Sequence, residues 1–395
     1  MKTYRIGVLG YGFIGRVHSW AQSNLRFYYD LPFDTEIVRV ATSRDRTAEA
    51  AADELGCEGT TDSTDITRAE DIDVVHVCTP NRLHKNALLD AMETGKHIYC
   101  DKPLVVDTEE AREIRDAAAA YLGDRETRDG RGPVFGMTFN NRHFPATRHA
   151  RQLVHDGFLG TPLSYRISYL HSGSADPSAP LKWKLSGEAG GGVIRDLAAH
   201  PLDLITWLLG PYTEMRAVTD IAYPQRPDPD DPHTSRPVDA EDNVIVLGHI
   251  RPEVAPERRG NPIPGILESS KVATGTEDEL RFEIHGSLGA IRFNSMDPHH
   301  LEIYDRRATP YAGPSPGGWT RLQTGGRYPA PARSFPSPKN VVGWLRAHLG
   351  SVADFMLHVD AGTPADPGLD DGLYVQELID AVERAGRTGS SVALS

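Results

Sequence analysis

The sequence has few cysteines, no long apolar run and a deficit of basic residues, and each of these excludes a class of protein. Its three cysteines, Cys57, Cys78 and Cys100, are odd in number, and two lie in apolar stretches typical of buried strands. We therefore expect no disulfide framework. No uninterrupted apolar segment approaches the roughly 20 residues that a membrane-spanning helix needs. The start at Met1 lacks the apolar core of a signal peptide, so we expect a cytoplasmic protein.

The charge balance excludes polyanionic partners. The 55 acidic and 42 basic residues give a net charge of -13, which repels phosphate backbones and anionic lipids. We expect neither nucleic acid nor a membrane as partner. The apolar share of 39% and the charged share of 25% are typical of a soluble globular protein, and 395 residues correspond to two or three domains.

A glycine turn follows the first apolar run of the chain. Residues 4–9 form a mostly apolar run that ends at Gly10-Tyr11-Gly12-Phe13-Ile14-Gly15, after which a helix-compatible stretch begins. In such a turn the first glycine allows the bend, the second lets a pyrophosphate approach the backbone, and the third lets helix and strand pack closely. The helix N-terminus adds amide donors for phosphate oxygens. With 37 glycines in the chain, an ordinary turn is the alternative.

The following segments alternate between strand and helix patterns. Strand patterns lie at 36–42, 73–78, 97–100 and 134–138, and helix patterns lie at 47–55, 84–94 and 108–122. This alternation predicts a parallel, doubly wound sheet. Ligands of such sheets bind beyond the carboxyl ends of the strands, so the loops 10–15, 79–84 and 101–103 are candidates for a site.

The end of the second strand bears on the choice of cofactor. A carboxylate there holds the ribose hydroxyl of NAD, whereas a cation and hydroxyl donors accommodate the 2′-phosphate of NADP. The strand ends in Ala41-Thr42-Ser43-Arg44, which favours NADP, but Asp45 is adjacent and Arg44 is equally well explained as a solvated residue at a helix start. The cofactor stays NAD or NADP.

The pattern changes after about residue 140. A helix pattern at 146–155 precedes strand patterns at 163–170, 243–250, 280–284, 290–293 and 301–304. Strands without intervening helices predict an open antiparallel sheet. The stretches 224–237 and 311–338 are rich in proline, glycine and polar residues, so we interpret them as long surface loops.

Segment 190–203 has the densest chemistry. Asp196, His200 and Asp203 are spaced i, i+4 and i+7, which places them on one face of a helix whose start Pro201 leaves uncertain. Three interpretations stay open. A metal site lacks a second histidine or cysteine nearby. A capped helix with an ordinary histidine is the second. The third is an acid–base pair, in which the histidine removes a hydroxyl proton and the aspartate orients it.

Lys102 follows the strand pattern at 97–100 and precedes Pro103. A lone lysine is usually a solvated surface charge. At the carboxyl edge of the sheet, however, its cation would lie where a nicotinamide binds and would lower the pKa of a substrate hydroxyl.

The chain resembles the glucose–fructose oxidoreductase, inositol dehydrogenase and rhizopine-catabolism family, Gfo/Idh/MocA. Motifs at 10–15, 79–84, 95–103 and 196–203 carry the resemblance in this order over almost the whole length. Segments 169–177 and 181–184 resemble the branch of levoglucosan dehydrogenase and other pyranoside 3-dehydrogenases. Two positions depart from the family pattern, namely Asp101, where the family usually has glutamate, and Ala198, where glycine is common.

The resemblance implies an α/β architecture and a reaction. An N-terminal Rossmann domain would span 1–140, a C-terminal α/β domain on an open, mostly antiparallel sheet would span 141–368, and a last helix at about 369–387 would pack back on the first domain. His200 would be the general base, Lys102 would polarise the reacting hydroxyl, and Asp196 would position the substrate. The chain would thus transfer hydride between a secondary hydroxyl of a sugar, glycoside or cyclic polyol and NAD(P), without a metal.

The candidate residues fall into two sets. Those for the cofactor are Gly10, Gly12, Phe13, Ile14, Gly15, Ser43, Arg44, Thr79, Pro80, Asn81, His84, Asp101 and Lys102. Those for the substrate are Asn140, Arg142, His171, Trp183, Lys184, Asp196 and His200. The resemblance also implies a homodimer or homotetramer formed through the C-terminal sheet. Relatives that cleave glycosidic bonds by transient oxidation with tightly bound NAD, and relatives that only sense sugars or nucleotides, supply two alternative functions.

Overall fold

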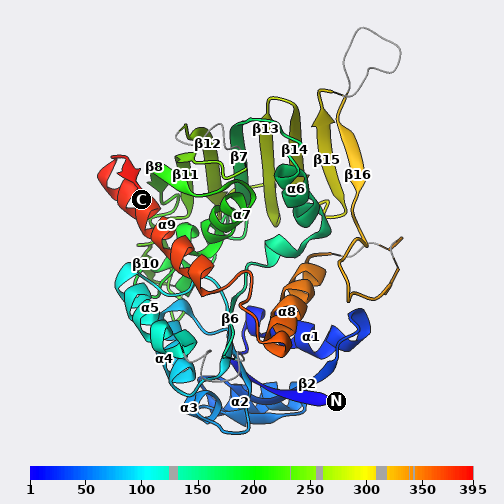
Figure 1. Cartoon of the computed structure of the whole chain (residues 1–395). Helices are drawn as coiled ribbons and strands as arrows, with labels where there is room; N and C mark the ends of the chain where they lie inside the picture. Colours follow the sequence, from blue (N-terminus) through cyan, green and yellow to red (C-terminus); the bar gives the residue numbers. More distant parts are fainter. Residues whose placement is uncertain are drawn as a thin grey trace. The chain divides into compact units, whose positions relative to one another are not determined.

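The computed structural model describes residues 1–123, 132–231, 233–254, 261–307, 318–337, 339–340 and 343–394. The chain forms two compact units (Figure 1). Unit 1 comprises Met1–His143 and Tyr328–Gln376, and unit 2 comprises Phe144–Arg327 and Glu377–Ser395. The domain bounds expected above, at 140 and 368, came from the change of sequence pattern and from the family resemblance, whereas these units follow the packing. Within the described ranges, no helix is both long and apolar enough to cross a membrane.

Unit 1 is built on a six-stranded parallel sheet in the order β3-β2-β1-β4-β5-β6. The strands are β1 (Lys2–Leu9), β2 (Phe33–Ala41), β3 (Glu58–Thr60), β4 (Val74–Val77), β5 (His97–Cys100) and β6 (Phe135–Met137). This is the strand order of the Rossmann fold, which confirms the predicted doubly wound sheet. Every residue of β4 is buried, as expected for a central strand that is covered on both faces.

Helices cover the parallel sheet. Those that connect its strands are α1 (Phe13–Tyr28), α2 (Asp45–Leu55), α3 (Thr64–Thr67), α4 (His84–Glu93) and α5 (Thr108–Gly123). α8 (Trp344–Ala361) comes from much later in the chain and packs against α1 (Figure 1). Its Leu349, Val352 and Met356 share one buried cluster with Ile6 and Leu25. This shared core explains why α8 belongs to unit 1 although the expected second domain extended to 368.

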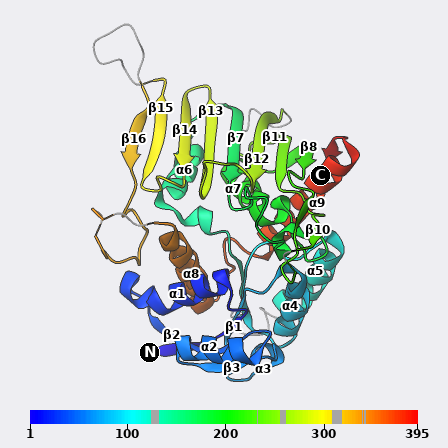
Figure 2. The ribbon, with the colours of Figure 1, turned by 180° about the vertical axis from the view of Figure 1, so that it is seen from behind.

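Unit 2 is built on a nine-stranded sheet in the order β16-β15-β14-β13-β7-β12-β11-β8-β17 (Figure 2). The strands are β7 (Pro162–Leu170), β8 (Tyr212–Asp220), β11 (Asn243–Ile250), β12 (Ile263–Ser270), β13 (Glu279–Gly286), β14 (Gly289–Asn294), β15 (His300–Asp305), β16 (Thr320–Gln323) and β17 (Val392–Ala393). β7 and β12 pair in parallel, and the other pairs that the structure describes in this sheet are antiparallel. The predicted open, mostly antiparallel sheet is thus confirmed.

Two helices, α6 (Pro145–His155) and α7 (Ala199–Leu209), cover one face of this sheet (Figure 1). The sequence did not predict strands β8 and β12 of this sheet. In β12, glycine, proline and serine interrupt the strand pattern. Gly265 of β12 has a packing reason, since a Cβ there would overlap the ring of Tyr165. Its register partner Gly248 in β11 makes room for Tyr212 in the same way.

The stretch 224–237 is not simply a surface loop. It contains the hairpin of β9 (Gln225–Pro227) and β10 (Ser235–Pro237), and Arg226 is only 2% exposed. That expectation was therefore wrong in part, because the Arg226 guanidinium is held inside by carbonyl oxygens of Ser174, Asp176 and Ala179. In the stretch 311–338, residues 311–317 and 338 lie outside the described residues, and β16 occupies part of the rest.

Candidate active site

The structure brings three predicted loops of unit 1 to one edge of the parallel sheet. Loops 10–15, 79–84 and 101–103 follow the adjacent strands β1, β4 and β5. The N–H of Cys78 donates to Leu9 O at 2.8 Å, and the N–H of Asp101 donates to Val77 O at 2.9 Å. These bonds keep the strands paired up to the loops. The shared carboxyl edge is the position at which parallel α/β sheets bind ligands.

The glycine turn between β1 and α1 has the form that a dinucleotide needs. Gly10 has φ 88, and a Cβ there would lie 2.7 Å from the carbonyl oxygen of Cys78. A Cβ on Gly15 would overlap the carbonyl oxygen of Gly10, so only glycine allows this close approach of helix and strand. Apart from its chain neighbours, a Cβ on Gly12 would have no atom of the described residues within 4 Å. The turn thus leaves open space at the N-terminus of α1, where a pyrophosphate fits.

Phe13 and Ile14 begin α1 beside this space. The Phe13 side chain is 75% exposed and stacks on Trp344 with ring centroids 5.7 Å apart. Ser43 and Arg44 lie exposed after β2, and Asp45 is the first residue of α2. No acid therefore stands at the tip of β2, as the sequence indicated.

His84 connects the loops that follow β4 and β5. Its Nε2 lies 2.9 Å from the carbonyl oxygen of Thr79, and its Nδ1 lies 3.1 Å from that of Pro103. The ring is fully buried, so its evident role is to hold the two loops together. Asn81 is also buried, whereas Pro80 is exposed. Cofactor contacts of these residues stay predictions.

Lys102 is half-buried, two residues beyond the end of β5. Further along the chain, the helical turn η2 (Asn140–His143) follows β6. Asn140 is 2% exposed, and its Nδ2 donor finds no acceptor among the residues that the structure describes. Such a buried donor costs about 1 to 3 kcal/mol, so it is a group that a bound ligand would satisfy.

Arg142 has a different environment from Asn140. Its side chain is buried, and its Nη1 and Nη2 donate to Asp366 at 2.9 Å and to Asp371 at 2.7 Å. These ion pairs join η2 to the chain that follows α8. They account for its burial, and substrate contact by Arg142 stays a prediction.

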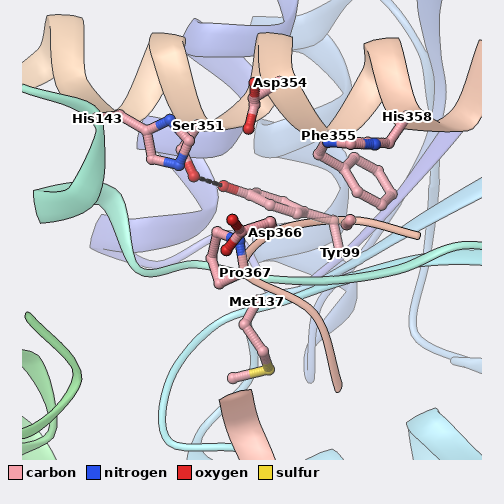
Figure 3. Close-up of a pocket in the computed structure, with 10 residues that line it drawn as sticks. Tyr99, Met137, His143, Ser351, Asp354, Phe355, His358, Asp366 and Pro367 are labelled. Carbon is pink, nitrogen blue, oxygen red and sulfur yellow. Dashed lines mark hydrogen bonds between the residues drawn. The ribbon is translucent and has the colours of Figure 1, made fainter. Parts of the chain in front are cut away.

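A small cavity of unit 1 lies between β5, β6 and α8 (Figure 3). Tyr99, Phe355 and Pro367 line it, and the Tyr99 hydroxyl donates to Ser351 Oγ at 2.7 Å. Its volume of about 10 Å³ is that of a single water site. This cavity is therefore too small for a dinucleotide or a sugar. Among the described residues, no group of three or more histidine, cysteine, aspartate or glutamate side chains is placed to hold a metal.

The acid-rich segment of unit 2 begins with a wide helical turn. Residues Ile194–Ala198 form η4, a π-helical turn, and α7 continues from Ala199. Pro201 lacks the N–H that would bond to the carbonyl of Leu197, and its ring crowds that carbonyl. The Ala199 N–H instead reaches back to Ile194 O. The wide turn resolves the uncertain helix start, and such turns are frequent at functional sites.

Asp196 lies on this π turn between two lysines. Lys184 Nζ donates to its two carboxylate oxygens at 2.9 and 3.1 Å, and Lys271 Nζ lies 3.3 Å from Oδ2. The glycines before η4 make this possible, because a Cβ on Gly191 would lie 2.7 Å from the Lys184 carbonyl. Asp203, predicted on the same face, is instead buried in α7.

A second cluster surrounds His200 in the same unit. The ring of Tyr169 lies edge-on to His200 with centroids 5.5 Å apart, and its hydroxyl donates to Asp278 Oδ1 at 2.6 Å. His171 Nε2 lies 2.8 Å from the same oxygen. Burial, reinforced by the Asp278 carboxylate, raises the pKa of Tyr169 well above its usual value. The Tyr169 hydroxyl therefore stays protonated, and the Tyr169 ring packs edge-on against the His200 ring.

Trp183 lies beside Lys184 in the turn η3 (Trp183–Leu185) and is 42% exposed. An exposed aromatic ring next to a lysine and a carboxylate is suited to stacking on a sugar ring. The structure thus brings Trp183, Lys184 and Asp196 together, and it places His171 and His200 around Tyr169. Sequence reasoning missed Lys271, a single charge just after β12, and Asp278, which lies in the acidic run Glu277-Asp278-Glu279 at the start of β13. Neither belongs to a recognisable motif.

Comparison with known proteins gives a family match over most of the chain. The model of the GFO_IDH_MocA oxidoreductase family with an NAD-binding Rossmann fold matches residues 4–121, and that of the GFO/IDH/MocA C-terminal domain matches residues 147–292. Levoglucosan dehydrogenase of Pseudarthrobacter phenanthrenivorans is 30% identical over 97% of this chain and 96% of its own length. Inositol 2-dehydrogenase of Rhizobium meliloti is 28% identical over 97% of both chains.

Solved structures agree with the sequence matches. A levoglucosan dehydrogenase in complex with NADH and levoglucosan has a TM-score of 0.87 and 30% identity and covers 99% of both chains. An oxidoreductase domain protein from Kribbella flavida has a TM-score of 0.88 and 30% identity over 100% of both chains.

Proposed function

Because the chain belongs to the GFO/IDH/MocA family of oxidoreductases with an NAD-binding Rossmann fold, we propose that it oxidises a secondary hydroxyl of a pyranose, glycoside or cyclic polyol. The observation that carries the proposal is the open turn at Gly12, at the edge where the loops of β1, β4 and β5 meet. The relatives named for levoglucosan and inositol oxidation support the substrate class.

Each proposed catalytic residue has one task. His200 removes the hydroxyl proton, for which an imidazole is suited near neutral pH. Asp196 accepts a hydrogen bond from a substrate hydroxyl, and Lys102 stabilises the developing alkoxide charge. The nicotinamide, when bound, supplies the hydride acceptor. Trp183 and Lys184, in the turn η3, contact the sugar ring and its hydroxyls.

The cofactor is proposed to be NAD or NADP, and the two are separable by experiment. The family description supports NAD, and the exposed Arg44 after β2 supports NADP. Calorimetric titration with both oxidised cofactors gives the preference. If Arg44 binds a 2′-phosphate, R44A weakens NADP binding at least about tenfold and leaves NAD binding unchanged.

The proposed reaction is tested by incubating the purified protein with a panel of pyranosides, anhydrosugars and inositols, and following the absorbance of reduced nicotinamide. Turnover with at least one compound is expected. Release of an aglycone without net cofactor reduction identifies a glycosidase instead. Absence of both turnover and cofactor binding contradicts the proposal, and cofactor binding without turnover favours a sensor.

We further propose that the protein is a homo-oligomer formed through the uncovered face of the nine-stranded sheet. Val218, Ile245, Leu247 and Ile266 are 40 to 70% exposed and lie side by side in β8, β11 and β12. α6 and α7 cover the opposite face. Apolar side chains grouped on a solvent-facing sheet are typical of an interface, and an isologous contact would pair this patch with itself.

Light scattering coupled to size-exclusion chromatography tests this arrangement. We expect at least a dimer for the unmodified chain and a monomer for L247D, which places an uncompensated charge in the patch. R216D, at the register partner of Leu247, is a rim control that should weaken association less. A monomeric unmodified chain contradicts the proposal.

A further inference from the structure

Lys271 follows the end of β12, the strand that pairs in parallel with β7. Parallel strands end at the same edge, so Lys271 and His171, which follows β7, are neighbours there. The His171 N–H donates to Ser270 O at 2.8 Å, and the Ser174 N–H donates to Lys271 O at 2.9 Å. η4, with Asp196, packs across this edge. The parallel pair therefore builds the Asp196 site within unit 2.

The Lys271 ammonium is fixed by three acceptors. Its Nζ donates to Lys184 O at 2.9 Å and to Gly192 O at 3.3 Å, and it lies 3.3 Å from Asp196 Oδ2. The side chain is 6% exposed. Three acceptors match the three N–H donors of an ammonium, so a charged lysine is accommodated although burial lowers its pKa.

Lys184 contacts the same carboxylate but is placed differently. Its side chain is 49% exposed, against 16% for Asp196. Its ammonium makes both of its described hydrogen bonds to Asp196. An exposed lysine loses little free energy when a ligand takes its place on the carboxylate. A buried lysine that moved away would leave its carbonyl acceptors buried without a donor.

We propose that Lys271 is a positioning residue, which keeps the Asp196 carboxylate ionised and oriented while Lys184 exchanges with a substrate hydroxyl. This inference rests on the proposed function, in which Asp196 binds that hydroxyl. Other charged groups that act on Lys271 are Lys184 and Glu241. The bonds of Lys271 Nζ to the carbonyls of Lys184 in η3 and of Gly192 just before η4 would thus transmit the positions of these segments to the carboxylate.

The test compares K271M, K271Q and K271R with a matched control. Lys96 of unit 1 is also a buried lysine, 8% exposed, and its Nζ donates to the carbonyls of Ala69 and Ile72. K96M therefore removes a buried ammonium that has no carboxylate at hydrogen-bond distance among the described residues. kcat, KM, cofactor affinity and thermal unfolding are measured for each variant.

K271M and K271Q are expected to lower kcat between about tenfold and a hundredfold, because displacing a substrate-positioning group such as the Asp196 carboxylate by about 1 Å can lower the rate by that factor. Cofactor affinity should stay within about twofold. The acid limb of the kcat/KM profile should move to higher pH, because the carboxylate has lost a cation. K271R should recover part of kcat, and K96M should lower the unfolding temperature only. Should K271M not fold, K271Q, which retains donors for the two carbonyls, replaces it.

Unchanged kcat and pH profile in K271Q overturn the inference, as does an equal loss of kcat in K96M. Failure of the proposed function is a separate result, namely no turnover by the unmodified chain. In that case carbon-13 NMR of the Asp196 carboxyl, assigned with D196N, decides. Its titration midpoint is expected to rise by at least about one pH unit in K271Q, and an unchanged midpoint contradicts the inference.

Discussion

Gly12→Ala separates the binding role of the glycine turn from its structural role. Gly12 has φ -78 and ψ -156, an extended conformation that alanine adopts without strain. Apart from its chain neighbours, no atom of the described part of the chain lies within 4 Å of the added methyl group. Gly12 is the N-cap of α1, and alanine is a poorer N-cap, which lowers the free energy of unfolding by about 0.5 to 1 kcal/mol. Alanine also reduces the entropy of the unfolded chain, which raises the free energy of unfolding by about 0.4 to 1 kcal/mol. The free energy of unfolding should therefore change by less than about 1 kcal/mol.

Cofactor affinity should fall because the methyl group occupies the space assigned to the pyrophosphate. We expect a loss of at least about tenfold, equivalent to about 1.4 kcal/mol, in calorimetric titrations. Gly15→Ala should differ, since its methyl group overlaps the Gly10 carbonyl, and should lower the free energy of unfolding by about 1 to 3 kcal/mol. G123A, at the end of α5, is the control, because the described residues place no atom within 4 Å of a Cβ there beyond the chain neighbours. Unchanged cofactor affinity in a folded G12A variant would refute the assignment of the turn.

Three further predictions concern buried charges. Burial raises the pKa of Glu383 to about 7, although Arg195 lies 2.9 Å away. The contribution of Glu383 to the free energy of unfolding is therefore complete below about pH 4.5 and is lost as the pH rises through 7. In urea unfolding, the free energy of unfolding should fall by at most about 2 kcal/mol between about pH 5.5 and 8 because of this group, and E383Q should remove that fall. Burial lowers the pKa of His76 to about 3, so below pH 6.5 only the unfolded chain takes up a proton there and the free energy of unfolding falls. In acid titrations, H76L should reduce this fall by up to about 1.4 kcal/mol per pH unit. R226M leaves carbonyls of the 174–179 loop without their donor and should lower the unfolding free energy by about 1 to 3 kcal/mol and raise cleavage of that loop in limited proteolysis.

The sequence predicts unit 1 better than unit 2 for a physical reason. Buried parallel strands such as β4 are continuously apolar, and the glycine turn marks the start of α1, so both leave strong local signals. β12 leaves a weak one, because Gly265 is required by the ring of Tyr165, which lies far away in the chain. The position of α8 in unit 1 is likewise a tertiary choice, made by a shared core.

The site shows the same limit. Asp196 and His200 are found by their spacing. Pro201 leaves the start of the helix uncertain in the sequence, and the wide turn before it is seen only in the structure. Lys271 is not found from the sequence, because a single lysine after a poorly patterned strand resembles any surface charge until β12 is paired with β7. Arg226 is hidden in a proline-rich stretch for the same reason, since its burial depends on carbonyls about 50 positions earlier.

The central claim is that a substrate hydroxyl carbon gives its hydrogen to a nicotinamide held at the Gly10–Gly15 turn. The most direct measurement uses pyranosides and inositols deuterated at the carbinol carbons, oxidised cofactor and the purified protein, followed by mass spectrometry of the cofactor. With the unmodified protein we expect reduced cofactor that carries one deuterium. With K102M and H200A we expect no deuterated cofactor. Reduced cofactor without deuterium, or equal transfer by the variants, would contradict it.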